Sequence, residues 1–321
     1  MDPASHLLFG RALAFTLERR SERRGVIAAL VVGSILPDID APLAFYRFDL
    51  YLRAHAAGTH SLVGTVFGAV VLALVLRALV RGSRPVPLFA ASWVGTLGHV
   101  FWDVADGSNT RLLEPFSGAV FGWHLVALAE PIVLVLLGAT VVAAWRQPAR
   151  ARLVAGTGLA LISVLLGVKL ISRTSARHRY DAAIGAESRP QAVDIFPHFG
   201  QLFGWVVFDR AGPSVRAWNV NDRAGVVSLA FEREDAPEDA AVARSRELPV
   251  VRSLLGFAAI PFVRVETDGG RRMVLWSDVL ECSSAGCDVS FGGAFDAVGT
   301  PLYQEIRIGG FRQRRPLPGA P

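Results

Sequence analysis

The stretch GTLGHVFWDVADG, residues 95–107, ends a long apolar run and carries three ionisable side chains. His99 and Asp103 are four positions apart, and Asp106 follows three positions later, so on a helix all three project from one face. An ion pair on the surface of an ordinary helix would have the same spacing. Inside an apolar helix, however, ionisable groups are costly and are usually functional. The composition of the surrounding chain decides between the two interpretations.

The first half of the chain has the composition of a membrane protein. Of 321 residues, 52% are hydrophobic and only 19% are charged, and the mean hydropathy is +0.39, which is too apolar for an ordinary soluble enzyme. Apolar runs of roughly the 20 residues that cross a bilayer occur at 61–80, 85–104, 125–145 and 153–171. Two shorter runs, 6–17 and 25–37, precede them. We predict an α-helical polytopic membrane domain over residues 1–173, with about four full spans and two shorter N-terminal helices.

The second half, residues 174–321, has the pattern of a small β-rich soluble domain. Short alternating runs such as WVVFD, FVRVE and MVLWSD are separated by glycine-containing turns. Residues 234–245 are typical of a charged linker or a short helix, and LPVVRSLLGFAA favours one more helix. Cys282 and Cys287 suit a disulfide across a tight turn, which requires an oxidising compartment; two unpaired thiols are the alternative. No residue in this half indicates a catalytic or metal-binding role.

The positive charge indicates a membrane topology. The net charge of +5 comes almost wholly from arginine, and Lys169 is the only lysine. The arginines gather at the ends of apolar runs, at 18–24, 77–84 and 146–152, which is typical of cytoplasmic loops. We therefore expect a lipid bilayer as partner, no nucleic acid, and a C-terminal domain outside the cytoplasm.

Two further motifs bring histidines and carboxylates to the same predicted membrane face. In LPDID, Asp38 and Asp40 follow Pro37, and an extended turn would let both carboxylates reach one ion or bridge two. In HAAGTHS, His55 and His60 precede a helix for which Thr59 or Ser61 is the expected N-cap, and a helix N-terminus keeps an imidazole neutral. A solvated turn and surface histidines are the alternatives.

Nine ionisable groups fall at this face. They are His6, Asp38, Asp40, His55, His60, His99, Asp103, Asp106 and Glu130. Glu130 lies in an apolar run before Pro131, where it needs a partner; Arg111 and His124 are the structural alternatives to a site role.

Histidines and carboxylates in this number indicate a divalent metal centre. We expect zinc, as one or two ions. The predicted ligands are His6, Asp38, Asp40, His60, His99 and Asp103, and the predicted catalytic residues are His55, Asp106 and Glu130. Metal-activated water would hydrolyse a phosphoester or similar bond, in a lipid or another substrate. An ion or metal transporter and a non-catalytic envelope scaffold are the alternatives.

The order of these motifs resembles a known family. ASHLLFG, GSILPDIDAP, HAAGTHS, GHVFWDVADG and LLEPFS recur in that order in the LexA-binding, inner-membrane-associated metal-dependent hydrolases of bacteria. The resemblance covers roughly residues 4–135 and implies a multi-pass protein of the bacterial inner membrane with metal-dependent hydrolase activity. It implies that seven polar positions belong to the family's site: His6, Asp38, Asp40, His55, His60, His99 and Asp103. Ala41 stands where the family often has histidine, and Ala56 and Ala57 replace an Arg-Gly pair, so no arginine stands there to contact an anionic substrate.

Overall fold

A computed structural model describes residues 2–17, 23–185 and 190–317. These residues form two compact units, one helical and one β-rich. The helical unit holds residues 1–46, 51–174 and 196–203, and the β-rich unit holds residues 47–50, 175–195 and 204–321. Arg19 and Arg20, two of the arginines in the predicted cytoplasmic loop, lie outside the described residues.

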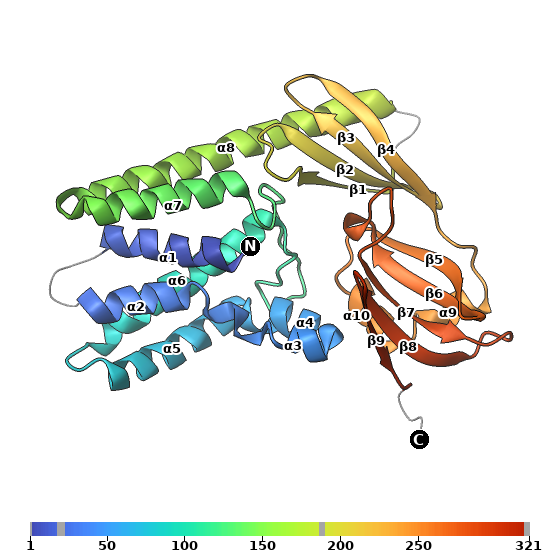
Figure 1. Ribbon diagram of the computed structural model, residues 1–321, viewed down its shortest axis with the longest axis horizontal. Coiled ribbons are helices and arrows are strands. Elements are labelled where there is room, and N and C mark those ends of the chain that lie inside the picture. Colours follow the sequence, from blue (N-terminus) through green and yellow to red (C-terminus); the bar gives the residue numbers. More distant parts are fainter. Residues whose placement is uncertain (1, 18–22, 186–189, 318–321) are drawn as a thin grey trace. The chain divides into compact units, whose positions relative to one another are not determined.

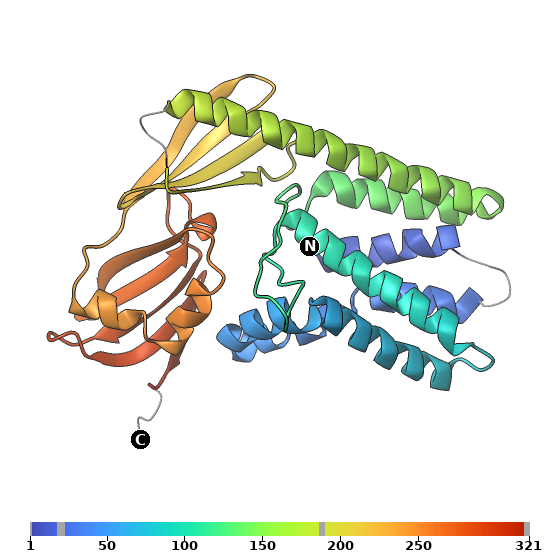
Figure 2. The same cartoon turned by 180° about the vertical axis from the view of Figure 1, so that it is seen from behind.

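Six long helices build the helical unit. They are α1 (Pro3–Leu17), α2 (Arg23–Gly33), α5 (Leu62–Leu79), α6 (Pro85–Asp106), α7 (Pro131–Arg146) and α8 (Ala151–Ile184), whose last turns belong to the β-rich unit. Helix α6 packs against α2 and α5, while α1 packs against α2 and α7 (Figure 1). Figure 2 shows α6, in cyan, crossing the blue helices α1 and α2. Short elements follow α2: η1 (Leu36–Asp40), α3 (Leu43–Tyr46), α4 (Phe48–Ala54) and η2 (His55–Thr59), and η3 (Pro148–Arg150) precedes α8.

Local sequence signals set the ends of the helices that carry the site. Ser61 caps α5, because its hydroxyl accepts the backbone N–H of Gly64 at 2.9 Å. Helix α6 begins with Pro85 at its first position and ends at Gly107, which adopts the left-handed conformation with φ 88°. Pro131 likewise begins α7. These signals fix which residues of each chain segment reach the end of the bundle.

Two helices of the described chain, rather than four, are long and apolar enough to cross a membrane. They are residues 62–79, with hydropathy 2.3, and residues 148–184, with hydropathy 2.1. The prediction of about four full spans is therefore wrong. In the 125–145 run the helix begins only at Pro131, so α7 has 16 residues, and Glu130 is its N-cap rather than a residue inside the helix. Helix α6 is long enough, with 22 residues, but its polar side chains lower its hydropathy.

Close contact between α2 and α6 depends on two glycines. A Cβ at Gly33 would lie 2.7 Å from the carbonyl oxygen of Ser92, and a Cβ at Gly95 would lie 2.6 Å from that of Leu30. Small residues at such positions let two backbones approach, as in many membrane helix pairs. The approach brings the end of α2 within reach of side chains on α6.

The described residues of the β-rich unit form two sheets, in which β2 to β4 and β5 to β9 pair antiparallel, and this confirms the predicted β-rich half. The first has strand order β1 (Ala192–Pro197), β2 (Gly204–Ala211), β3 (Ser214–Asn221) and β4 (Val226–Glu234). The second has β5 (Pro261–Asp268), β6 (Arg271–Asp278), β7 (Val289–Phe295), β8 (Pro301–Ile308) and β9 (Phe311–Arg315) in sequence order.

Two short helices and a disulfide complete this unit. Helix α9 (Ala240–Ser245) lies in the segment expected to be a charged linker or a short helix, and α10 (Pro249–Leu255) lies where LPVVRSLLGFAA favours a helix; both pack on strands of the second sheet. The 3₁₀ turn η5 (Val279–Glu281) follows β6, and a disulfide then joins Cys282 to Cys287.

Candidate metal centre

Histidine and aspartate side chains from four separate segments meet at one end of the helical unit. His6 lies on α1, Asp38 lies on η1, and His60 follows directly after η2. His99 and Asp103 both lie on α6. Three groups of these residues, with His55 as the sixth member, offer ligand atoms within 4.8 Å of one another. The groups are His6–Asp38–His99, Asp38–His55–His60 and His60–His99–Asp103.

Asp103 lies between three imidazoles. Its Oδ2 atom is 2.9 Å from Nε2 of His60 and 3.1 Å from Nε2 of His99, and its Oδ1 atom is 3.2 Å from Nε2 of His6. His6 and His99 are fully buried, and Asp103 is 2% exposed. The spacing of four residues on α6 therefore brings His99 and Asp103 to a common point, as the sequence predicts.

The backbone of Ser34 fixes the tautomer of His99. Nδ1 of His99 lies 2.8 Å from the carbonyl oxygen of Ser34, which can only accept a hydrogen bond. Nδ1 must therefore carry the proton, so in the neutral imidazole Nε2 presents its lone pair. That lone pair faces Oδ1 of Asp38 at 3.3 Å as well as Asp103.

A second hydrogen-bond chain fixes the tautomer of His60. The hydroxyl of Thr59 donates to Oδ2 of Asp40 at 2.9 Å, because a carboxylate only accepts. The same hydroxyl oxygen is 3.0 Å from Nδ1 of His60 and must accept there, so Nδ1 is the donor. In the neutral ring Nε2 of His60 therefore also presents a lone pair, 3.0 Å from Nε2 of His99.

The result is a buried point surrounded by acceptors. Two imidazole lone pairs face each other at 3.0 Å and share carboxylate oxygens of Asp103 and Asp38. Without a metal ion these lone pairs attract protons: burial lowers the pKa of His60, but hydrogen bonds with Asp103 and Asp38 outweigh burial and raise it. A divalent cation would replace such protons, since metal ligands must be deprotonated.

His6 closes the site on the side of α1. Its ring stacks on that of His99, with 3.7 Å between the centroids and 16° between the planes. Its Nε2 lies 3.2 Å from Oδ1 of Asp103, while neither ring nitrogen forms a hydrogen bond of good geometry with the described residues. A fully buried imidazole held only by this contact is costly, which favours an additional ligand at Nε2.

His55 and the two aspartates of LPDID form the more open side of the centre. The motif is a 3₁₀ helix rather than the predicted extended turn, so Asp38 and Asp40 point to different sides. Asp40 approaches Nδ1 of His55 at 2.9 Å, and Asp38 lies 3.9 Å from its Nε2. The side chain of His55 is 19% exposed, compared with 2% or less for the other histidines of the centre.

Charge is concentrated at Asp38. Burial raises the pKa of Asp38, but the imidazoles of His60 and His99 outweigh it and hold the pKa well below its usual range. Tyr51 packs on His55 with 4.6 Å between ring centroids, and its pKa is raised by burial and by the charges of Asp38, Asp40 and Asp103. Asp38 is therefore an anionic ligand donor, while Tyr51 stays neutral.

Three predicted residues lie outside the ligand groups of the described chain. Asp40 uses both carboxylate oxygens, one for His55 and one for Thr59, and so orients these residues. Asp106 accepts the backbone N–H of Ser108 at 2.9 Å and its hydroxyl, at the end of α6. Glu130 pairs with Lys169 at 2.8 Å, with both side chains fully buried.

Sequence reasoning missed the partners that orient these groups. The sequence indicates Thr59 only as a possible helix cap, and a backbone carbonyl such as that of Ser34 carries no sequence signal. Lys169 does carry one, because it is the only lysine of the chain and lies within an apolar run. Lys169, rather than Arg111 or His124, is the partner of Glu130.

Comparison with known proteins places this centre in a family. A family model described as "YdjM inner membrane protein" matches residues 1–176, which include every residue of the three ligand groups. The chain is also similar to the uncharacterized protein YfhP of Bacillus subtilis (strain 168), with 26% identity over 142 residues, 42% of this chain and 43% of that protein. The match thus spans less than half of that relative. No solved structure matches the chain significantly. Because the family model covers more than half of the chain and the whole centre, the protein belongs to the YdjM inner membrane protein family.

Proposed function

We propose that this protein is a membrane-bound, metal-dependent hydrolase. The observation that carries the proposal is the set of lone pairs converging from His60, His99, Asp38 and Asp103, with both imidazole tautomers fixed from outside. Hydrogen bonds that orient metal-binding histidines in this way are typical of metal centres. Imidazole and carboxylate donors suit zinc. Each pair of ligand groups shares one residue (Asp38, His60 or His99), so the groups fit one ion or two neighbouring ions.

His55 is the proposed general base. Its Nδ1 is held by Asp40, which leaves Nε2 directed toward Asp38 and the centre. Its partial exposure lets it pass a proton to solvent. In phosphoester hydrolysis, the oxygen of water bonds to phosphorus, the bond from phosphorus to the leaving oxygen breaks, and the base takes the proton that water loses. A divalent ion would supply Lewis-acid activation of the water and of the phosphoryl oxygen.

The proposal gives Asp106 and Glu130 no catalytic role. Asp106 is engaged by Ser108, and Glu130 neutralises Lys169 inside the bundle. We also propose that the β-rich unit lies outside the cytoplasm. The disulfide Cys282–Cys287 supports this location, because disulfides persist in oxidising compartments, and so does the arginine-rich character of the opposite loops.

Metal analysis of the purified full chain tests the proposal. Wild-type protein, His99→Ala and Asp38→Ala are compared with His178→Ala, which removes an exposed histidine of α8 as a matched control. We expect bound zinc or another divalent ion in the wild type and in His178→Ala, and loss of it in the two site variants. Absence of metal from the wild type, or equal metal in all four proteins, contradicts the metal centre.

Activity assays then separate hydrolysis from the alternatives. We expect metal-loaded wild type to hydrolyse a soluble phosphodiester such as bis-p-nitrophenyl phosphate, and His55→Ala to retain metal but lose most of the rate. Bound metal without hydrolysis, together with metal uptake into proteoliposomes, would favour a transporter. Neither metal nor hydrolysis would favour a scaffold.

A further inference from the structure

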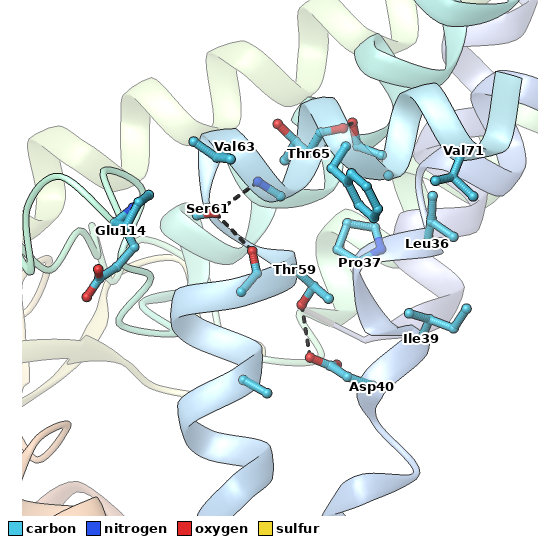
Figure 3. A pocket seen from close by; sticks show the side chains of 17 residues that line it. Leu36, Pro37, Ile39, Asp40, Thr59, Ser61, Val63, Thr65, Val71 and Glu114 are labelled. Atoms are coloured by element: carbon cyan, nitrogen blue, oxygen red, sulfur yellow. Dashed lines mark hydrogen bonds between the residues drawn. The ribbon is translucent and has the colours of Figure 1, made fainter. Parts of the chain in front are cut away.

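A cavity of about 710 Å³ lies beside the metal centre, between η1, η2 and α5. This volume is within the range of about 300–1,000 Å³ that is typical of small-molecule sites. Most of its lining is apolar, and the ionisable residues among the described ones that line it are Asp40 and Glu114. Figure 3 shows Asp40 and Thr59, joined by their hydrogen bond, in the wall next to Ile39.

The wall of the cavity is part of the metal centre's support. Asp40 and Thr59, which line the cavity, are the residues that orient His55 and His60. Thr96 also lines it, one helical turn before His99 on α6. A ligand that fills the cavity therefore contacts the two residues that are hydrogen-bonded to His55 and His60.

The other side of the cavity faces the surface of a candidate membrane span. Helix α5 contributes Val63, Phe67 and Val71, which are 48%, 71% and 43% exposed, and η1 contributes Ile39, which is 70% exposed. A rim this apolar would be unfavourable in water but is suited to hydrocarbon. In a bilayer, the molecules that reach this rim are lipids.

We propose that the cavity holds an acyl chain of a glycerophospholipid and that the substrate of the metal centre is the phosphoester of that lipid. This inference rests on the proposed hydrolase function and deepens it. The apolar rim admits the chain from the bilayer, and the Asp40–Thr59 wall, hydrogen-bonded to His55 and His60, brings the cavity next to the centre. Phosphoester oxygens are hard donors that a divalent ion binds well.

Two valines on α5 provide a matched pair of variants. Val71 lines the cavity and is 43% exposed, whereas its neighbour Val70 is 41% exposed and is not among the lining residues. Val71→Trp should fill the cavity, and Val70→Trp adds the same side chain elsewhere on the helix. Both substitutions place tryptophan at an exposed position of the span, so both variants are expected to fold.

Photolabelling measures occupancy without requiring turnover. The full chain is reconstituted with a phosphatidylglycerol that carries a diazirine on one acyl chain, and labelled peptides are mapped by mass spectrometry. We expect labels on residues 36–39 and on α5 in the wild type and in Val70→Trp, and strong loss of these labels in Val71→Trp. Equal labelling of the two variants, or labels spread evenly over the spans, would overturn the acyl-chain site.

Kinetics link the cavity to the reaction. Val71→Trp should raise the KM for long-chain phosphatidylglycerol several-fold, whereas the control Val70→Trp should leave the KM for this lipid and the KM and kcat for bis-p-nitrophenyl phosphate unchanged. If the soluble ester is hydrolysed but the lipid is not, the substrate inference fails while the hydrolase function stands. If the wild type lacks metal and hydrolyses neither ester, the hydrolase function fails and the substrate inference with it.

Discussion

Thr59 connects three polar groups of the centre through one hydroxyl. It donates to Asp40 and accepts from His60, so it holds the His60 ring with Nε2 toward Asp103. Thr59→Val keeps the shape of the side chain but removes both hydrogen bonds. Because such supporting bonds are worth about 10–100-fold in metal affinity, we expect a loss of that size in a zinc titration against a competing chelator.

The conservative change at this position provides the control. Thr59→Ser retains the hydroxyl and should bind zinc nearly as tightly as the wild type. If Thr59→Val also binds zinc with wild-type affinity, the tautomer of His60 is not set by this chain of hydrogen bonds.

The residues of the three candidate ligand groups could be predicted from sequence, whereas Asp40, a predicted ligand, instead supports His55, and the partners Thr59 and Ser34 could not be predicted. His99 and Asp103 are neighbours by helical spacing alone, and the same face collects His6 and His60 because apolar runs end there. Thr59 and the carbonyl of Ser34 act through contacts across 19 and 65 residues of chain, respectively. Such contacts depend on tertiary packing, and no local pattern in a single sequence indicates them.

The close packing of α2 on α6 positions His99. A Cβ at Gly95 would meet the carbonyl oxygen of Leu30 at 2.6 Å and the backbone nitrogen of Ser34 at 3.0 Å. Gly95→Ala must therefore push α2 away and lengthen the bond from His99 to Ser34. We expect a cost of about 1–3 kcal/mol in stability, seen as a lower Tm, together with reduced metal content.

Gly138→Ala is the matched control for this helix contact. A Cβ at Gly138, in the middle of α7, meets nothing within 4 Å. Alanine there should be neutral or stabilising by up to about 1 kcal/mol, because glycine is a poor helix former. Equal Tm and metal content in Gly95→Ala and Gly138→Ala would show that the α2–α6 contact does not position the site.

A cross-strand ion pair makes the stability of the β-rich unit depend on pH. Glu305 on β8 lies opposite Arg314 on β9, with 2.7 Å between Oε2 and Nε, and it also contacts Arg307 at 2.6 Å. Burial raises the pKa of Glu305, but the two arginines outweigh it and lower the pKa below the ordinary value. A lowered folded-state pKa stabilises the fold above the unfolded-state pKa, and this stabilisation is lost as pH falls through the folded-state value.

Glu305→Gln should therefore lower the Tm at pH 7, and this difference should shrink as the pH falls below about 4 and through the folded-state pKa of Glu305. We expect the substitution to reduce the free energy of unfolding by about 1–2 kcal/mol at neutral pH. The effect is no larger because the Arg314 side chain is 54% exposed, so that water screens its contact with Glu305. Thermal unfolding of the full chain in detergent, followed by tryptophan fluorescence, measures it. Glu234→Gln, at an exposed position of the edge strand β4, should change little at any pH. A constant difference between wild type and Glu305→Gln across pH would contradict the assignment.

Hydropathy alone predicts poorly where the helices of this chain begin and end. The apolar run from Leu125 predicts a helix, yet the chain between Gly107 and Glu130 is irregular and α7 starts only at Pro131. Hydropathy reports burial, whereas proline and capping residues report where a helix begins. The same distinction explains α8, which continues beyond its apolar run to Ile184 because no proline or glycine interrupts it before Gly185.

The order of segments along the chain predicts on which side of the membrane each part lies. Arginines mark the loops before α6 and before α8, and the disulfide marks the β-rich unit. These two observations are independent, because loop charge governs insertion while disulfides report the redox state of a compartment. We therefore predict that Cys282 and Cys287 lie outside the cytoplasm and that Gln147, between α7 and α8, lies inside it.

Cysteine labelling of intact cells tests this topology. After treatment with a membrane-impermeant reductant, an impermeant maleimide should label Cys282 and Cys287 without permeabilisation. In a Cys282→Ser, Cys287→Ser background, Gln147→Cys should be labelled only after permeabilisation; Gln147 is exposed, so the probe can reach it. The reverse pattern would place the β-rich unit in the cytoplasm. Because the candidate metal centre lies at the end of α6 opposite the arginine-marked loop, that result would also turn this centre, and the proposed lipid supply, to the cytoplasmic leaflet.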